Sequence, residues 1–431
     1  MPRLLILGAT GFIGSEIASA LIADGHDVRL AARDLDYGRR LFPGADWRLA
    51  DLNRLTAQGD WAPLLEGVDI VVNAAGLLQS APGDDVTRVQ RDAVMALGEA
   101  CRDTGVSRIV QISAAGVAGN DSDFMTSKAE ADSALLAGPV PAIVLRPGLV
   151  IGRNAYGGTQ LIRMAAALPF GLFPPLGSPI RCIALADVVA AVRLAVAADP
   201  PSDAPVDLVG GETHALPGII AAHRRWLGLR DWRRPMRLPR PFLTLAMRAS
   251  DALGLLGWRS PLRSNAVAAL ANGVEGDAAA TRAWLDRAPL TLDQTLAAMP
   301  SGKQDRLMAW ATALLPAALL ALGIMWLVSG IATLADIDRA SAIMRQTGIG
   351  AGASWWLTFG GAVADIALAL MLAVRRWVRP ALMGMVLLAG AYLLLGTVLL
   401  PALWADPLAP LAKVLPSIVL ALLLLPMMEK R

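Results

Sequence analysis

The sequence predicts a doubly wound α/β domain with a parallel sheet, followed by an all-α domain of four transmembrane helices. Three observations support this: short apolar runs alternate with helical segments, a glycine-rich turn follows the first run, and long apolar segments fill residues 306–431. Hydrophobic residues make up 55% of the 431 residues and charged residues only 17%, which is typical of membrane proteins. The net charge of +3 is small, so no nucleic-acid partner is expected.

The first predicted strand runs directly into the glycine-rich turn. Leu4 to Leu7 form an apolar run, and Gly8, Gly11 and Gly14 follow before apolar residues recur at helical spacing. Glycines let backbone N–H groups approach a pyrophosphate, and the N-terminus of a helix favours negative charge. Because the turn lies between a strand and a helix, it predicts nucleotide binding; the alternative is a tight turn without a ligand.

The end of the second predicted strand, DVRLAA, indicates which nucleotide binds. An acidic residue there would hydrogen-bond the ribose 2′-hydroxyl of NAD, whereas arginine suits the 2′-phosphate of NADP. Arg33 follows the strand, so NADP(H) is favoured over NAD(H). Asp34 comes next, so binding of NAD remains possible. The alternative interpretation of Arg33 is a solvent-exposed arginine without a role in binding.

Four further strands are predicted at WRLADL, DIVVNAAG, SRIVQISAAG and PAIVLRPGLVIG. Helical segments separate them, and this alternation predicts the parallel sheet. Ligands bind beyond the carboxyl ends of such strands. The residues at these ends, Asp51, Ala75, Ser113 and Pro147, should therefore line one site.

The motifs GATGFIG, ADL, NAAG, ISAAG, FMTSK and LRPGLVIG together resemble the short-chain dehydrogenase/reductase superfamily, most closely its extended and atypical branches, over residues 1–300. Residues 271–297 are similar to the tail of proteins related to the large nucleotide-binding accessory subunit of respiratory complex I. The resemblance implies a Rossmann-type fold with these cofactor-binding residues: Gly8, Thr10, Gly11, Phe12, Ile13, Gly14, Arg33, Asp51, Leu52, Ala74, Ala75, Gly76, Lys128 and Pro147.

The resemblance also implies that Ser113 lies near the nicotinamide and that Lys128 holds the nicotinamide ribose. Active members carry a tyrosine four residues before the lysine, where this chain has Phe124. General acid–base help of that kind is worth about 10²–10⁴-fold, and phenylalanine cannot supply it. The candidate catalytic residues are Lys128, Ser113 and Tyr156, which follows the sixth strand and could substitute; an ordinary loop tyrosine is the alternative.

The domain boundaries are predicted at 1–220 for the nucleotide domain, 221–305 for its basic C-terminal portion and membrane joint, and 306–431 for the membrane domain. The joint begins with an arginine-rich stretch, residues 223–242, that contains Trp226 and Trp232. Arginine with tryptophan suits a membrane surface, and residues 242–258 are predicted to form an amphipathic helix. A helix covering the substrate cleft is the alternative.

Four apolar segments, beginning near Leu307, Ser354, Ala381 and Leu411, are long enough to cross a bilayer of roughly 30 Å. Seven basic residues lie on the side of the termini: Lys303, Arg306, Arg375, Arg376, Arg379, Lys430 and Arg431. Three lie on the other side: Arg339, Arg345 and Lys413. The positive-inside rule therefore predicts a multi-pass protein of the inner membrane with the N-terminal domain and the C-terminus in the cytoplasm.

The number and arrangement of the segments resemble the DoxX-like family of small four-span proteins, some of which are tied to quinone-linked redox chemistry. Asp365 lies in the middle of the second segment, where a charge is costly and indicates either function or an interhelical bond. The cysteines and histidines have no metal-ligand spacing, so no metal is expected.

Two functions fit these features. The first is a membrane-bound oxidoreductase that passes a hydride from NAD(P)H to a lipophilic acceptor such as a quinone. The second is a non-catalytic NADP(H)-binding module that stabilises or regulates a membrane redox complex. Membrane lipid is an expected partner in both, and a membrane redox subunit is expected in the second. A nucleotide-gated transporter has less support, because four short segments with one buried acid make a thin translocation path.

Overall fold

The computed structural model describes residues 2–80, 82–117, 122–197, 204–258, 260, 262–407 and 409–428. The chain forms two compact units. The N-terminal unit comprises Met1–Gly254 and Arg259–Trp310, and the membrane unit comprises Leu255–Trp258 and Ala311–Arg431.

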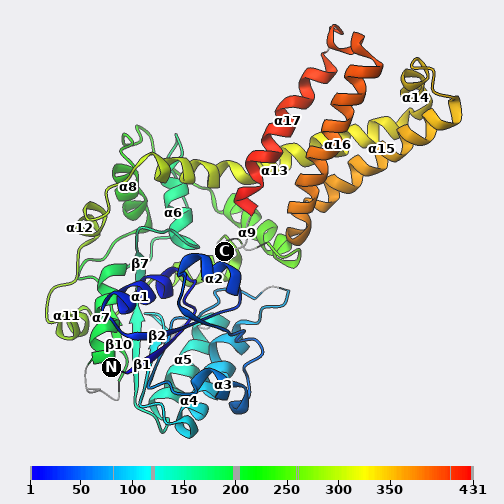
Figure 1. The fold of residues 1–431 in the computed structure, drawn as a ribbon. Coiled ribbons are helices and arrows are strands. Elements are labelled where there is room, and N and C mark those ends of the chain that lie inside the picture. Colours follow the sequence, from blue (N-terminus) through cyan, green and yellow to red (C-terminus); the bar gives the residue numbers. More distant parts are fainter. Residues whose placement is uncertain are drawn as a thin grey trace. The chain divides into compact units, whose positions relative to one another are not determined.

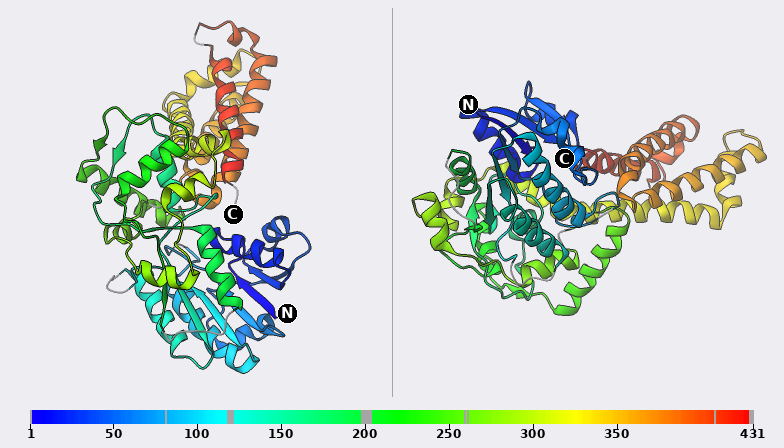
Figure 2. Two further views of the ribbon diagram at one scale, coloured as in Figure 1. Left: turned by 90° about the vertical axis from the view of Figure 1, so that its left-hand side faces the viewer. Right: turned by 90° about the horizontal axis from the view of Figure 1, so that it is seen from below.

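The N-terminal unit contains a parallel sheet of seven described strands with helices on both faces (Figures 1 and 2). The strand order is β10-β6-β5-β4-β1-β2-β3, so the connections change direction between β1 and β4. The strands are β1 (Arg3–Leu7), β2 (Asp27–Ala32), β3 (Asp46–Leu49), β4 (Ile70–Asn73), β5 (Arg108–Ile112), β6 (Ala142–Pro147) and β10 (Val206–Leu208). This is the doubly wound arrangement that the sequence predicts, and ligands bind where the direction changes.

Two apolar cores lie on opposite faces of the sheet. One face is covered by α1 (Phe12–Ala23), α7 (Leu185–Ala197) and α11 (Ala278–Leu285). The other is covered by α3 (Ala62–Leu65), α4 (Ala93–Thr104) and α5 (Asp123–Leu136). Because the central strands β1 and β4 are buried on both sides, their sequences are apolar runs rather than alternating ones.

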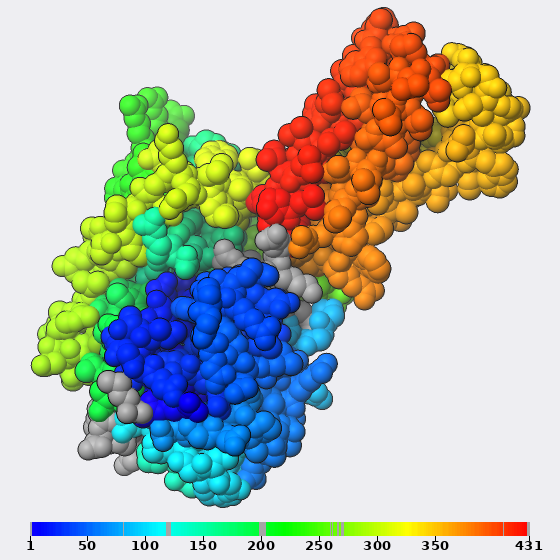
Figure 3. Space-filling view, viewed as in Figure 1, coloured from blue at the N-terminus to red at the C-terminus, as the bar shows by residue number. Residues whose placement is uncertain are grey.

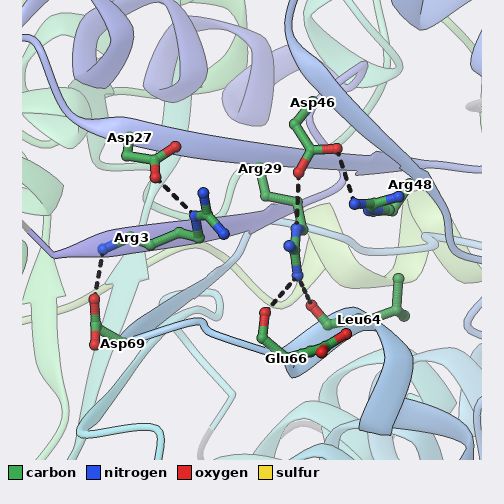
Figure 4. Close-up of polar contacts among 8 residues, drawn as sticks. All are labelled: Arg3, Asp27, Arg29, Asp46, Arg48, Leu64, Glu66 and Asp69. Carbon is green, nitrogen blue, oxygen red and sulfur yellow. Dashed lines mark hydrogen bonds and ion pairs between the residues drawn. The ribbon is translucent and has the colours of Figure 1, made fainter.

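Ion pairs hold the amino ends of the first strands together (Figure 4). Arg29, in β2, is only 6% exposed. Its guanidinium donates to Asp46 at 3.0 Å and to the carbonyls of Leu64 and Glu66, each at 2.9 Å. Every acceptor lies at the start of β3 or next to α3, away from the carboxyl ends of the strands. This charged cluster is therefore structural.

The sixth predicted strand is broken in two. Gly148 separates β6 from β7 (Leu149–Ile151), which pairs with β9 (Cys182–Ala184) in a small separate sheet. A Cβ on Gly148 would lie 2.6 Å from the carbonyl oxygen of Arg181, so the close approach of that backbone requires glycine. The break directs the chain out of the main sheet and into the small one.

A third apolar core lies beside the small sheet. It is built from α6 (Gly158–Ala167), α8 (Leu216–Trp226) and α12 (Leu292–Ala297). The remaining elements of this unit are α2 (Leu35–Leu41), the paired strands β8 (Leu172–Phe173) and β11 (Met236–Arg237), α9 (Arg240–Leu255) and α10 (Ser264–Ala271).

The start of the arginine-rich stretch packs inside this unit. Arg224 donates to the carbonyls of Ala166 and Leu168, and its guanidinium lies 4.3 Å from the centre of the Trp232 ring. The indole of Trp232 donates to Leu168, and that of Trp226 donates to a carbonyl at 2.5 Å. Both tryptophans therefore serve the domain interior rather than a membrane surface.

Acid is expected to destabilise the N-terminal unit through His223. This side chain is 1% exposed, and its burial lowers the pKa of the imidazole to about 4. The unfolded chain, with a pKa of about 6.5, then binds more protons than the folded one between pH 4 and 6.5. The free energy of unfolding should therefore fall by about 3 kcal/mol as the pH falls through that window.

The measurement is thermal unfolding of the detergent-purified chain at several pH values, with His223→Gln as the control that cannot titrate. The stability difference between the wild type and this variant should narrow as the pH falls from 7 to 4. A difference independent of pH would contradict the prediction.

Within the described residues, the membrane unit has four helices long and apolar enough to cross a membrane. They are α13 (Lys303–Ala335), α15 (Ala351–Met371), α16 (Val378–Leu399) and α17 (Pro410–Leu424). α16 and α17 pack against each other around Leu382, Met385 and Ala421 (Figure 3). The four spans agree with the prediction, whereas the short helix α14 (Ile337–Arg345) between the first two was not predicted.

Candidate functional site

The glycine turn between β1 and α1 is tightly folded against the end of β4. Gly8 has a φ of +73°, and a Cβ there would lie 2.7 Å from Cα of Ala75. A Cβ on Gly14 would lie 2.3 Å from the carbonyl oxygen of Gly8. The N–H of Gly11 donates to that same oxygen at 2.8 Å. Gly8 is thus required by contact and by backbone conformation, and Gly14 is required by contact.

The turn leaves donors for an anion. Gly11 is the N-cap of α1, and no side chain among the described residues caps the helix. The first N–H groups of α1, at Phe12 and Ile13, therefore lack the side-chain partner that helix ends usually have. A pyrophosphate fits this cradle, because helix N-termini with free N–H groups bind phosphate. Thr10 and Ile13, both half-buried, complete the turn.

An ion-paired network that the sequence did not predict lies beyond the carboxyl ends of β2 and β3. Arg33 pairs with the buried carboxylate of Asp84, which also accepts from Asn53 at 3.1 Å. Asn53 in turn donates to Asp51 at 3.2 Å, so the predicted residues Arg33 and Asp51 are joined through two that were missed. Asp34 caps α2 by accepting from the backbone N–H of residue 37 at 2.9 Å.

An amide pair fixes the turn after β4. Asn73 is fully buried, donates to Gln111 at 2.8 Å and accepts from the N–H of Ala75 at 3.1 Å. This holds the predicted ribose-lining residues Ala74 and Gly76 on either side of Ala75. At the end of β6, on the far side of β5 from β4, Pro147 accepts from the backbone N–H of residue 115 at 2.9 Å.

A buried charged cluster lies beyond the ends of β5 and β6. Ser113 donates to Asp132 at 2.8 Å, and Arg146 donates to the same carboxylate at 2.9 Å. Lys128 is 5% exposed and donates to the carbonyl of Ile112 at 3.1 Å. Ser113 and Lys128 are thus brought together, as predicted, with an aspartate between them that was not predicted.

Burial dominates the protonation of this cluster. It lowers the pKa of Lys128 to about 8, with the nearby charge of Asp132 acting in the opposite direction. It also raises the pKa of Asp132, while the bonds from Ser113 and the charge of Arg146 act against that rise. The charges of Lys128 and Asp132 therefore favour each other, and Arg146 further favours the charged form of Asp132.

Phe124 lies over the ammonium of Lys128, with the nitrogen 5.7 Å from the centre of the ring. The ring packs against the core on the α4–α5 face of the sheet. The hydroxyl proton of Ser113 points to Asp132 rather than outward. The local chemistry is therefore a buried cation beneath an aromatic ring, without a phenol next to it.

Tyr156 is not joined to this cluster. It lies between β7 and α6, its side chain is 53% exposed, and within the described part of the chain its phenol has no recorded hydrogen bond. Its backbone N–H donates to the hydroxyl of Thr159 at 3.0 Å. The ring of Phe12 reaches toward this loop, since a Cβ on Gly152 would lie 3.2 Å from it.

The intramembrane Asp365 joins three helices. Ser329, on α13, donates to one carboxylate oxygen at 2.8 Å, and Tyr392, on α16, donates to the other at 3.0 Å. Gly361 makes room for the phenol, because a Cβ there would lie 2.8 Å from its oxygen. Of the two interpretations that the sequence allows for Asp365, this geometry matches the interhelical hydrogen bond.

Comparisons with known families match both units. The NAD(P)H-binding family matches residues 8–173, and the DoxX-like family matches residues 323–422. The chain is a fusion of an NAD(P)H-binding Rossmann domain, like that of short-chain dehydrogenases, with a DoxX-like domain. With its four candidate spans, the DoxX-like fusion is a membrane protein.

Three curated relatives resemble the nucleotide-binding half of the fusion. A ceramide reductase of Caulobacter vibrioides is 27% identical over 255 residues, which cover 57% of this chain and 77% of the relative. The ketoreductase sphI of Aspergillus fumigatus is 30% identical over 25% of this chain and 34% of its own length. The mouse epimerase family protein SDR39U1 is 28% identical over 41% of this chain and 63% of its own length. The fusion thus spans less than two thirds of the last two.

Solved structures show the same fold. A dTDP-glucose 4,6-dehydratase from Bacillus anthracis in complex with NAD has a TM-score of 0.52 at 14% identity, covering 72% of this chain and 97% of its own. A UDP-glucose 4-epimerase from Thermotoga maritima has a TM-score of 0.52 at 15% identity, covering 69% and 97%. The N-terminal unit therefore has a reductase- and epimerase-like nucleotide-binding fold.

Proposed function

We propose that the fusion is an inner-membrane NAD(P)H-dependent reductase of a lipophilic acceptor, with its nucleotide domain in the cytoplasm. The observation that carries this proposal is a nucleotide turn with free helix donors on the same chain as four apolar spans. A reductant site tethered to a bilayer suits an acceptor dissolved in that bilayer. The name of the bacterial relative, a ceramide reductase, also points to a lipid rather than a sugar.

The residues of the chain and the cofactor have separate roles in the proposed reaction. NAD(P)H, when bound, supplies the hydride. The N–H groups of the glycine turn and of Phe12 and Ile13 would hold the pyrophosphate, and the Lys128 ammonium would hold the ribose. Asp132 and Arg146 keep Lys128 in place. Because Phe124 has no hydroxyl, the proton that joins the hydride on the acceptor comes from water, which favours a quinone over an ordinary ketone.

The test is NAD(P)H oxidation by the purified chain in lipid nanodiscs with a short-chain quinone, and separately with a keto-sphingolipid. Oxidation with the quinone is expected, and oxidation only with the keto-sphingolipid would move the acceptor to lipid ketones. Lys128→Met, which keeps the length of the side chain but removes the charge, is the control and should lose most of the activity. Oxidation no faster than that of Lys128→Met with either acceptor would reject a reductase.

A second function is favoured by Phe124 and by the inward-facing hydroxyl of Ser113. In this alternative the fusion binds NADP(H) without turnover and stabilises or regulates a membrane redox complex. It predicts tight binding, no oxidation, and membrane subunits that remain bound in mild detergent. Phe124→Tyr separates the two, since a gain of carbonyl reduction would show a complete site that lacks only its acid.

We also infer a preference for NADP(H). Asp34 is engaged as a helix cap, whereas Arg33 can exchange Asp84 for a 2′-phosphate. Arg33→Ala is expected to weaken NADPH binding about tenfold, or about 1.4 kcal/mol, and to leave NADH binding nearly unchanged. Asp84→Asn, which frees the guanidinium, should strengthen NADPH binding. Titration of both nucleotides into each variant measures this, and an equal loss for both in Arg33→Ala would contradict it.

A further inference from the structure

Helix α9, which is labelled in Figure 1, exposes an apolar stripe. Phe242 is 63% exposed, Leu245 66%, Leu253 44% and Leu256, just past the helix, 40%. With Ala249 between them, these positions follow one another at intervals of three and four residues, which places them on one side of a helix. Large apolar side chains gathered in this way mark a surface that meets something apolar.

The other sides of α9 are already used. Leu243, Ser250 and Gly254 are buried. Asp251, at the border of that side, accepts from the N–H of Ser264 at 3.1 Å. Arg240, Thr244 and Arg248 are exposed along the edge of the stripe. The helix therefore has a packed side, an apolar exposed side and a basic edge between them.

The neighbouring segment has the same character. β11 precedes α9 by two residues, and its Met236 is 54% exposed beside the exposed Phe170. The backbone N–H of Met236 donates to Gly171 at 2.7 Å, which fixes this pair. Arg234 and Arg237 are exposed next to it. A surface of exposed apolar side chains flanked by arginines thus extends from β11 through α9.

The residues directly after α9 belong to the membrane unit. The carbonyl of Leu256 accepts from the N–H of Arg375 at 3.0 Å, and the indole of Trp258 donates to Ala373 at 2.7 Å. Ala373 lies between the second and third candidate spans and Arg375 begins the third, at the level where a transmembrane protein meets the lipid headgroups. The end of α9 is therefore fixed at that level. Its 16 residues reach at most about 24 Å from there.

We propose that α9 is an interfacial helix that lies on the bilayer surface. Its apolar stripe enters the region between headgroups and acyl chains, and Arg240 and Arg248 bind lipid phosphates. The bilayer is the occupant favoured over a second protein, because the four spans guarantee its presence and the Leu256–Arg375 bond fixes the depth.

The test is a spin-label scan of the full chain in nanodiscs that contain phosphatidylglycerol. Single cysteines replace Phe242, Leu245 and Thr244, and Leu49, which is 63% exposed in β3, serves as the aqueous control. The two native cysteines are buried and should not react. Labels at 242 and 245 are expected to be open to oxygen and shielded from a nickel chelate, whereas labels at 244 and 49 should be open to the chelate.

Chelate access at 242 and 245 equal to that at 49 would overturn the proposal. Shielding from both reagents would also overturn it, since it would indicate a protein cover. Replacing phosphatidylglycerol with phosphatidylcholine should reduce the shielding, and Arg248→Gln should remove that dependence on charge. Leu245→Ser, a mild change at an exposed position, should increase chelate access at 242 while the thermal unfolding of the chain stays the same.

Discussion

Gly8→Ala is expected to abolish NAD(P)H binding and to destabilise the N-terminal unit by about 2–5 kcal/mol. Two costs add. Residue 8 has a φ of +73°, which an L-residue adopts with strain, and the new methyl carbon would lie 2.7 Å from Ala75. The backbone of the turn must move away from β4 to relieve the contact. The movement displaces the N–H groups that the pyrophosphate needs.

Gly25→Ala is the matched control. Gly25 ends α1 with a φ of +84°, but nothing lies within 4 Å of a Cβ there. This variant therefore carries the conformational cost of about 1 kcal/mol without the collision, and it should bind the nucleotide normally. Titration with NADPH and thermal unfolding in detergent measure both effects. Wild-type affinity in Gly8→Ala would show that the turn does not form the binding site.

The parallel sheet and the glycine turn could be predicted from the sequence because both depend on local residue patterns. Leu4 to Leu7 can only be a short buried strand before three glycines at that spacing. The break at Gly148 was missed for the opposite reason. It arises from the carbonyl of Arg181, 33 residues along the chain, and nothing in the run LRPGLVIG indicates that neighbour. β10, only three residues long, gives no periodic signal either.

The site residues that directly follow strand ends were predicted. Their hydrogen-bonding and ion-pairing partners from other parts of the chain were missed. Ser113 and Lys128 meet as expected, but Asp84 reaches Arg33 from a loop 51 residues away. Asp132 could have been found, since it lies one helical turn after Lys128 and so shares its side of α5. The positions of Tyr156, Trp226 and Trp232 depend on tertiary packing, which composition alone does not determine.

Arg146→Met is the second large effect, and it is expected to destabilise the N-terminal unit by about 3–5 kcal/mol. The variant leaves Asp132, which has no exposed surface, without the guanidinium that donates to it at 2.9 Å. Removing one partner of a buried pair costs far more than the pair itself contributes. Arg193→Met is the control, because its pair with Asp24 is half-exposed and should cost at most about 1 kcal/mol.

The pH dependence and a double variant identify the cause. Without Arg146 the folded-state pKa of Asp132, already raised by burial, rises further above that of the unfolded chain. The folded protein then binds more protons than the unfolded one, so the loss should be greatest above pH 7 and should shrink as the pH falls. Asp132→Asn combined with Arg146→Met removes the stranded charge and should restore most of the stability. If the double variant is as unstable as Arg146→Met alone, lost packing is the cause rather than the uncompensated carboxylate.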